Sequence, residues 1–192
     1  MEGFSFKSGA TMILSDQELI TQFKDKESSD IAFNRIILKY QEKIYWHIRR
    51  MVLDHDDADD ILQEVFIKAW KGLDKFREES KLYTWLYQIA SNESLTYLKK
   101  KKRRFFLNVD DVENELENSF KNEQFFSGDE IQEKLQKALL QLPEKQRIVF
   151  NMKYYDEIKY EDMSEILKTS VGALKASYHH AVKKIESFLT SH

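Results

Sequence analysis

Apolar residues recur every three or four positions through most of the chain, a spacing typical of helices that bury one face. The longest stripe predicts a helix in the first third of the chain and comprises Phe33, Ile36, Ile37, Tyr40, Ile44, Ile48 and Met51. Ahead of this stripe, Ser15 and Glu18 have the spacing of a capping box, which predicts the start of a short helix.

Two further helices are predicted before residue 105. The acidic segment 54–60 suits a helix start, where negative charge complements the dipole, and Gly72 is expected to end this third helix. Its inner face is predicted to contain Ala58, Ile61, Val65 and Ala69. Ser80 can cap a fourth helix over about 81–104, which is expected to bury Leu82, Leu86 and Ile89.

The C-terminal third predicts a helix-turn-helix. A helix striped by apolar residues begins near Glu130, and Pro143 is expected at the first position of the next helix. Residues 160–167 predict a short helix, 168–170 a tight turn, and 171–189 a longer helix capped by Ser170. A helical hairpin with a purely structural role is the alternative interpretation of this pattern.

Composition favours an all-α fold, because 5 Gly and 1 Pro are too few for the turns of a sandwich or barrel. The absence of Cys excludes disulfides, thiolate zinc sites and cysteine nucleophiles. Two small helical domains joined by an acidic flexible linker are predicted. Their order is a flexible lead over 1–14, a first domain over 15–104, the linker over 105–129 and a helix-turn-helix domain over 130–192.

The net charge of −3 is unevenly distributed. Residues 1–104 contain 19 basic and 17 acidic residues, and residues 130–192 contain 10 and 9. The linker contains 1 basic and 7 acidic residues, so the acidic excess belongs to one short segment. A net negative charge therefore does not exclude a nucleic-acid-binding face on either domain.

The sequence contains no motif typical of an enzyme, a cofactor-binding site or a metal site. The five histidines are scattered, no glycine-rich phosphate loop occurs, and the aspartates of 54–60 lack the spacing of a calcium loop. We expect no catalysis, no cofactor and no metal site. No signal peptide or apolar run of membrane-spanning length is visible, so a cytoplasmic protein without membrane insertion is expected.

Two features favour nucleic-acid binding over a purely structural role for the fourth helix. The fourth helix ends in six consecutive basic residues, 99–104, which alone suit a solvated helix end. The face that leads into them contains Gln88, Asn92 and Thr96, and polar groups followed by cations suit bases and phosphates. Aromatic residues before and within this helix either fill the core or stack on unpaired bases: Phe76, Tyr83, Trp85 and Tyr87.

Several segments resemble extracytoplasmic-function sigma factors of bacterial RNA polymerase. Segment 57–66, DADDILQEVF, is similar to their polymerase-binding helix. Phe76-Arg77 and segment 84–92, TWLYQIASN, are similar to their promoter-melting region. Leu142-Pro143-Glu144, Arg147 and segment 171–175, VGALK, are similar to their C-terminal domain. The resemblance covers roughly 15–104 and 130–189 in the family's order and implies a sigma factor that recognises the −10 and −35 elements and melts the promoter.

The resemblance implies three sets of binding residues. The expected core-polymerase residues are Asp57, Asp60, Gln63 and Glu64. Those expected at the −10 element and in melting are Phe76, Arg77, Glu78, Lys81, Trp85, Gln88, Asn92, Lys99, Lys100 and Arg103. Those expected at the −35 element are Ser170, Lys175, Ala176, His179, His180 and Lys183.

Two departures from the family pattern affect the last two helices. Lys168 and Thr169 stand where the turn usually contains Gly, and Ser177 and His180 replace common arginines. The implied partners are core RNA polymerase, promoter DNA and an anti-sigma factor. The alternatives are a two-domain regulator that binds DNA without polymerase, and a helical adaptor that binds only proteins.

Overall fold

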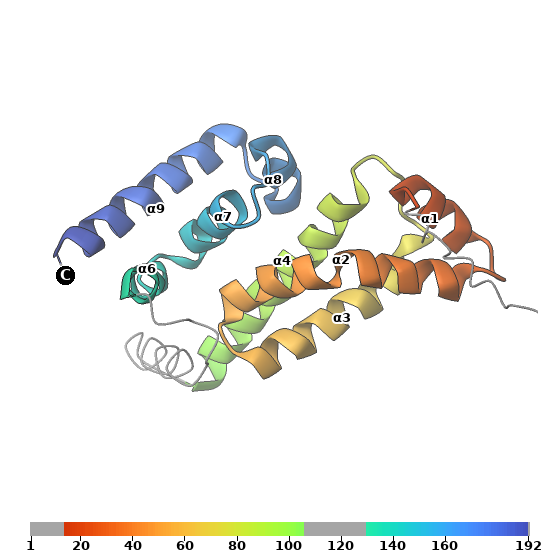
Figure 1. Cartoon of the computed structure of the whole chain (residues 1–192), viewed down its shortest axis with the longest axis horizontal. Coiled ribbons are helices and arrows are strands. Elements are labelled where there is room, and N and C mark those ends of the chain that lie inside the picture. The colour runs from red at the N-terminus through yellow and green to blue at the C-terminus, as the bar shows by residue number, and fades with distance from the viewer. Residues whose placement is uncertain (1–13, 106–129, 192) are drawn as a thin grey trace, which may run out of the picture.

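The computed structural model describes residues 14–105 and 130–191, and every regular element within these ranges is a helix (Figure 1). Most of the predicted N-terminal lead and of the acidic linker lies outside the described residues. The N-terminal helices are α1 (Asp16–Lys24), α2 (Ser29–Val52), α3 (His55–Leu73) and α4 (Leu82–Phe105). The C-terminal helices are α6 (Glu130–Leu140), α7 (Glu144–Tyr154), α8 (Tyr160–Leu167) and α9 (Val171–Ser191).

Local side-chain chemistry starts the first and third helices where the sequence predicts. The carboxylate of Glu18 accepts the backbone N–H of Ser15 at 2.7 Å, and the Ser15 hydroxyl caps α1 in return. Asp54 caps α3 by accepting the N–H of Asp57 at 2.9 Å. Each contact satisfies a donor that has no partner within the helix, so both helices have defined starts.

Gly72 has a different role from the one expected. The helix α3 continues to Leu73, so Gly72 does not end it. A Cβ at Gly72 would lie 3.1 Å from the ring of Trp85 on α4. Glycine therefore makes room for the indole between α3 and α4, where the ring also packs on Phe76 at a centroid distance of 5.1 Å.

The helix-turn-helix is present with the predicted proportions. Lys168 ends α8 in the left-handed conformation, and the Ser170 hydroxyl caps α9 by accepting the N–H of Ala173 at 3.3 Å. Pro143 precedes α7 as its N-cap instead of occupying its first turn. The inner face of α9 buries Leu174, Ala181 and Ile185, whose spacing places them on one side of the helix.

The C-terminal helices lie on one side of the N-terminal bundle (Figure 1). Helix α7 packs against α2, and α8 packs along α4. The larger core joins residues from both parts of the chain, including Leu86, Met152, Met163 and Ile166. A smaller core lies among α6, α7 and α9. The two predicted domains are therefore closed against one another in this structure.

Candidate polymerase and nucleic-acid interfaces

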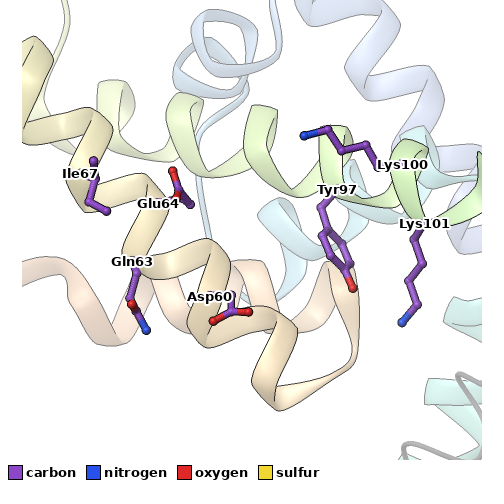
Figure 2. Close-up of a pocket in the computed structure, with 7 residues that line it drawn as sticks. All are labelled: Asp60, Gln63, Glu64, Ile67, Tyr97, Lys100 and Lys101. Carbon is purple, nitrogen blue, oxygen red and sulfur yellow. The ribbon is translucent and has the colours of Figure 1, made fainter. Parts of the chain in front are cut away.

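A groove of about 590 Å³ lies between α3 and the C-terminal half of α4 (Figure 2). Helix α3 contributes Asp60, Gln63, Glu64 and Ile67, and α4 contributes Tyr97, Lys100 and Lys101. Three of the four residues expected to bind polymerase therefore share this groove, and all three are exposed. Acidic groups on one wall face basic groups on the other, so the groove presents both signs of charge.

Asp57, the fourth expected polymerase-binding residue, is engaged within the protein. Its Oδ2 lies 3.2 Å from the ammonium of Lys101, and a second bridge of 2.6 Å joins Lys68 to Glu93. The two bridges tie α3 to α4. Asp60, in contrast, forms no salt bridge with any described residue, which leaves its carboxylate available to a partner.

The basic run at the end of α4 divides between two faces. Lys100 and Lys101 line the groove beside α3 (Figure 2). Lys99 and Arg103 are exposed, and their spacing places them on the same helical stripe as the exposed Asn92. Of the predicted phosphate-binding cations on α4, Lys99 and Arg103 thus continue the stripe that contains Asn92, whereas Lys100 belongs to the groove.

The loop between α3 and α4 is anchored at both its start and its middle. Phe76 is buried against Trp85, while the neighbouring Arg77 is exposed. Glu78 has a φ of 59°, and its carboxylate accepts from the ammonium of Lys24 on α1 at 3.1 Å. Hydrogen bonds from Gln17 and then Lys24 lower the pKa of Glu78. The loop therefore presents Arg77 from a fixed backbone.

Lys81 and Tyr83 at the start of α4 hold a carboxylate of α8. Asp162 accepts from the Tyr83 hydroxyl and, at 3.2 Å, from the Lys81 ammonium. Burial acts to raise the pKa of Asp162, but the hydrogen bonds from Tyr83 and Lys81 outweigh it and the pKa is lowered. The same contact raises the pKa of Lys81. Lys81, which is predicted to bind DNA, is thus paired with a residue of the C-terminal part of the chain.

A second carboxylate of the C-terminal part is held by α2. Arg50 Nη1 donates to Asp156 at 2.7 Å, and His47 Nδ1 lies 3.0 Å from the same carboxylate, which can only accept. His47 Nε2 lies 3.0 Å from the Ser91 hydroxyl on α4. No sequence pattern predicted this cluster. Its visible signal in the sequence is a histidine directly before Ile48, within the buried apolar stripe of α2.

Helix α7 also contacts the C-terminal end of α2. The buried guanidinium of Arg147 donates to the carbonyl of Met51 at 3.2 Å, and the Asn151 amide donates to that of Arg50 at 3.3 Å. Burial lowers the pKa of Arg147. Carbonyls in the last turn of a helix lack intrahelical partners and carry partial negative charge, so these donors complete the end of α2.

The outer face of α9 exposes polar and basic side chains of the kinds that bind nucleic acid. The residues predicted at the −35 element that stand exposed on this helix are Lys175, Ala176, His179, His180 and Lys183. Ser170 is exposed too, but its hydroxyl accepts a hydrogen bond as the cap. The Lys175 ammonium lies 5.7 Å from the ring centroid of Tyr160. This face is polar and basic, opposite the buried stripe.

Neither a helix able to span a membrane nor a group of three or more side chains placed to hold a metal ion occurs within residues 14–105 and 130–191.

Two family models match the chain, one in each part. The model of sigma-70 region 2 matches residues 36–104, and that of sigma-70 region 4 matches residues 132–185. The first match covers α3, the loop and α4, and the second covers α7, α8 and most of α9. The two matches, in this order along the chain, identify a sigma-70-type transcription initiation factor.

Relatives narrow the class further. The chain is 32% identical to the RNA polymerase sigma-H factor of Pseudomonas aeruginosa over 182 residues, which cover 91% of this chain and 93% of the relative. It is 33% identical to the ECF RNA polymerase sigma factor SigW of Bacillus subtilis, over 80% of this chain and 87% of the relative. It is 31% identical to the ECF RNA polymerase sigma-E factor of Escherichia coli K12, over 91% and 94%. The chain belongs to the extracytoplasmic-function (ECF) sigma factors, and it serves RNA polymerase in promoter recognition and transcription initiation.

Solved structures share the fold. One is CnrH in complex with the cytosolic domain of CnrY, with a TM-score of 0.66, 20% identity and coverage of 92% of this chain and 97% of that one. Another is the sigma factor RpoE of Bartonella quintana in complex with the anti-sigma factor NepR, with a TM-score of 0.64, 24% identity and coverage of 82% and 96%. The predicted all-α architecture is confirmed.

Proposed function

We propose that three separate faces of this sigma factor divide the work of initiation. The groove face of α3, with Asp60 and Glu64, binds core polymerase. The exposed stripe of α4 and the preceding loop bind and open the −10 element, and the outer face of α9 binds the −35 element. The observation that carries this proposal is the presence of two exposed basic faces on separate parts of the chain, one on α4 and one on α9.

The proposed division implies two units, 15–104 and 130–192, that act on promoter elements some distance apart. The intervening segment 105–129 gives the length needed for the units to separate. No covalent step is assigned to any residue, because strand opening needs only preferential binding of the opened form. The protein acts where the polymerase acts, in the cytoplasm.

In vitro transcription with purified core polymerase on a genomic library tests the proposed function. Transcripts that start downstream of a shared pair of sequence elements are expected with the sigma factor and not with core polymerase alone. Binding to library DNA without any transcription would instead identify a DNA-binding regulator, and failure to bind either core polymerase or DNA would leave only an adaptor.

The loop is proposed to capture an unpaired base, because it lies between packed helices and its backbone is anchored. Flipping a base out of the stack costs a few kcal/mol, which binding of the opened strand must offset. Because Phe76 is buried, the useful variant replaces 77–80 with Gly and Ser and spares the aromatic ring. Permanganate footprinting of unpaired thymines should show loss of opening, while core binding persists. Normal opening by this variant would place strand capture elsewhere.

Control by an anti-sigma factor is proposed by analogy with the RpoE–NepR complex. A free sigma factor competes for polymerase at all times, so restraint is needed when its promoters are silent. Deleting a gene for such a partner should raise transcription from the sigma factor's own promoters. If deletion of every candidate neighbour leaves those promoters unchanged, the control lies elsewhere.

A further inference from the structure

Two sites on the N-terminal helices each hold one carboxylate of the C-terminal part. In the first, Arg50 and His47 surround Asp156, whose side chain is 5% exposed. In the second, Lys81 and Tyr83 surround Asp162, whose side chain is 13% exposed. Both sites therefore combine a basic side chain with a second hydrogen-bond donor around a single oxyanion.

The donors of both sites are positioned largely by the N-terminal helices. The His47 ring packs against Tyr87 at a centroid distance of 4.9 Å and contacts the Ser91 hydroxyl. Lys81 and Tyr83 lie at the start of α4, where the helix dipole also favours an anion. The supports of His47, Lys81 and Tyr83 do not involve α7 or α8, so these three donors keep their arrangement when the C-terminal helices move away. Arg50 alone also lies over a ring of the C-terminal part, that of Tyr155 at the end of α7, 4.8 Å from its centroid.

The position of the second site indicates which anion replaces the carboxylate. Lys81 directly follows the loop proposed to capture the opened strand, and its spacing to Gln88 and Asn92 places all three along one side of α4. The second site contains Tyr83, and His47 of the first site contacts Ser91. Tyr83 and Ser91 are eight residues apart on α4, roughly 12 Å along the helix, which a DNA strand spans in a few nucleotides. Phosphate oxygens accept hydrogen bonds from the same charged donors as carboxylate oxygens do.

We propose that the two sites bind phosphates of the promoter strand, and that Asp156 and Asp162 occupy them as phosphate mimics while the protein is closed. This inference rests on the proposed role of α4 and its loop. It follows that closure and −10 binding exclude one another: the C-terminal part must release both sites before DNA enters them. The same donors then serve the closed protein and the DNA complex.

The test uses the full chain with Asp156→Asn and Asp162→Asn combined. Because the chain has no Cys, a cysteine pair at the exposed positions Glu42 and Glu186 can carry fluorophores that report separation of the two parts. We expect energy transfer to fall and affinity for fluorescein-labelled single-stranded DNA of random sequence to rise about tenfold, since two competing anions are removed.

Matched variants separate this effect from net charge and from simple unfolding. Asp30→Asn with Glu165→Gln removes the same charge at exposed positions and should change neither signal. On the open background, Lys81→Ala should lower DNA affinity and reduce the slope of its salt dependence by about one, whereas Lys26→Ala should not. Circular dichroism checks that each variant keeps its helices.

The charge swap Lys81→Asp with Asp162→Lys gives a second, independent measurement. It keeps an ion pair between α4 and α8, so energy transfer should stay near the wild-type value, but it places a negative charge in the proposed phosphate site. Adding Asp156→Asn to the swap frees only the first site, so DNA affinity should rise less than in the double Asn variant.

Two outcomes would overturn the inference. Opening of the double Asn variant without any gain in DNA affinity over its control would make the two pairs simple contacts between the units. Unchanged energy transfer in that variant would show that the carboxylates do not hold the closed form. No polymerase or promoter enters these measurements, so they stand apart from the transcription experiment, whose failure would reject the proposed function itself.

Discussion

Lys168 has the backbone conformation that glycine adopts most readily, with φ 51° and ψ 44°. A Cβ at this C-cap costs steric energy, and no described hydrogen bond from its side chain offsets it. We expect Lys168→Gly to raise the free energy of unfolding by about 0.5–1 kcal/mol. Urea denaturation followed by circular dichroism measures the change.

The matched control for this prediction is Lys184→Gly. Lys184 is exposed within α9, so the substitution removes a comparable side chain but introduces glycine into a helix interior. A loss of about 1 kcal/mol is expected there. If both substitutions destabilise the protein equally, the turn is not strained at Lys168.

Single residues in the predicted melting region illustrate what sequence can decide. The spacing of the aromatics allowed either a core or a stacking role. Burial of Phe76 against Trp85 favours the core role for these two rings, which depends on the close approach of Gly72 from another helix. That approach leaves no periodic signal, because it depends on how α3 crosses α4. Their contact with DNA stays a prediction.

The exposed acidic residues of α3 are predicted to contribute to binding of core polymerase. We expect Asp60→Lys with Glu64→Lys to weaken core binding by about 1–3 kcal/mol, because the two exposed acids lose charge complementarity with the partner. Pull-down titration with core polymerase gives the affinity. Glu42→Lys with Asp30→Lys makes the same charge change on α2 and should leave binding intact. Equal losses in both variants would remove α3 from the interface.

Two lysines of α9 are predicted to contact the −35 element in different ways. Lys183→Ala should weaken binding to all DNA sequences and flatten the salt dependence, because a phosphate contact is independent of sequence. Lys175→Ala, near the start of the helix, should change sequence preference instead. Binding across a set of duplexes at several salt concentrations distinguishes the two. Lys145→Ala on α7 is the exposed control. Identical behaviour of Lys175→Ala and Lys183→Ala would contradict the assignment.

Helix positions could be predicted from sequence because their causes are local. Capping residues such as Ser15 and Ser170 act within three positions, and an apolar stripe identifies the buried face of a single helix. The closed arrangement could not be predicted in this way. His47 meets Asp156 across 109 positions and Lys81 meets Asp162 across 81, and no periodicity pairs such residues.

Closure changes what the whole molecule presents to DNA. Helix α8 packs along α4, so the closed form neutralises Lys81 while leaving Asn92, Lys99 and Arg103 exposed. The outer face of α9 is likewise exposed in this form. The closed protein therefore keeps its proposed −35 surface open but only part of its proposed −10 surface. Polymerase binding that separates the two units would complete the latter.

The contribution of Asp162 to closure should depend on pH in a defined direction. Its pKa is lowered below the usual 3.8 in the folded protein, so its contribution is fully present above 3.8 and is lost as pH falls through the folded value. Lys81 has a raised pKa, so its contribution is present below 10.5 and is lost only at higher pH. Energy transfer between the labelled units should therefore fall in acid below about pH 4. Asp162→Asn should remove that part of the acid transition; an unaltered transition in this variant would show that Asp162 does not hold the closed form.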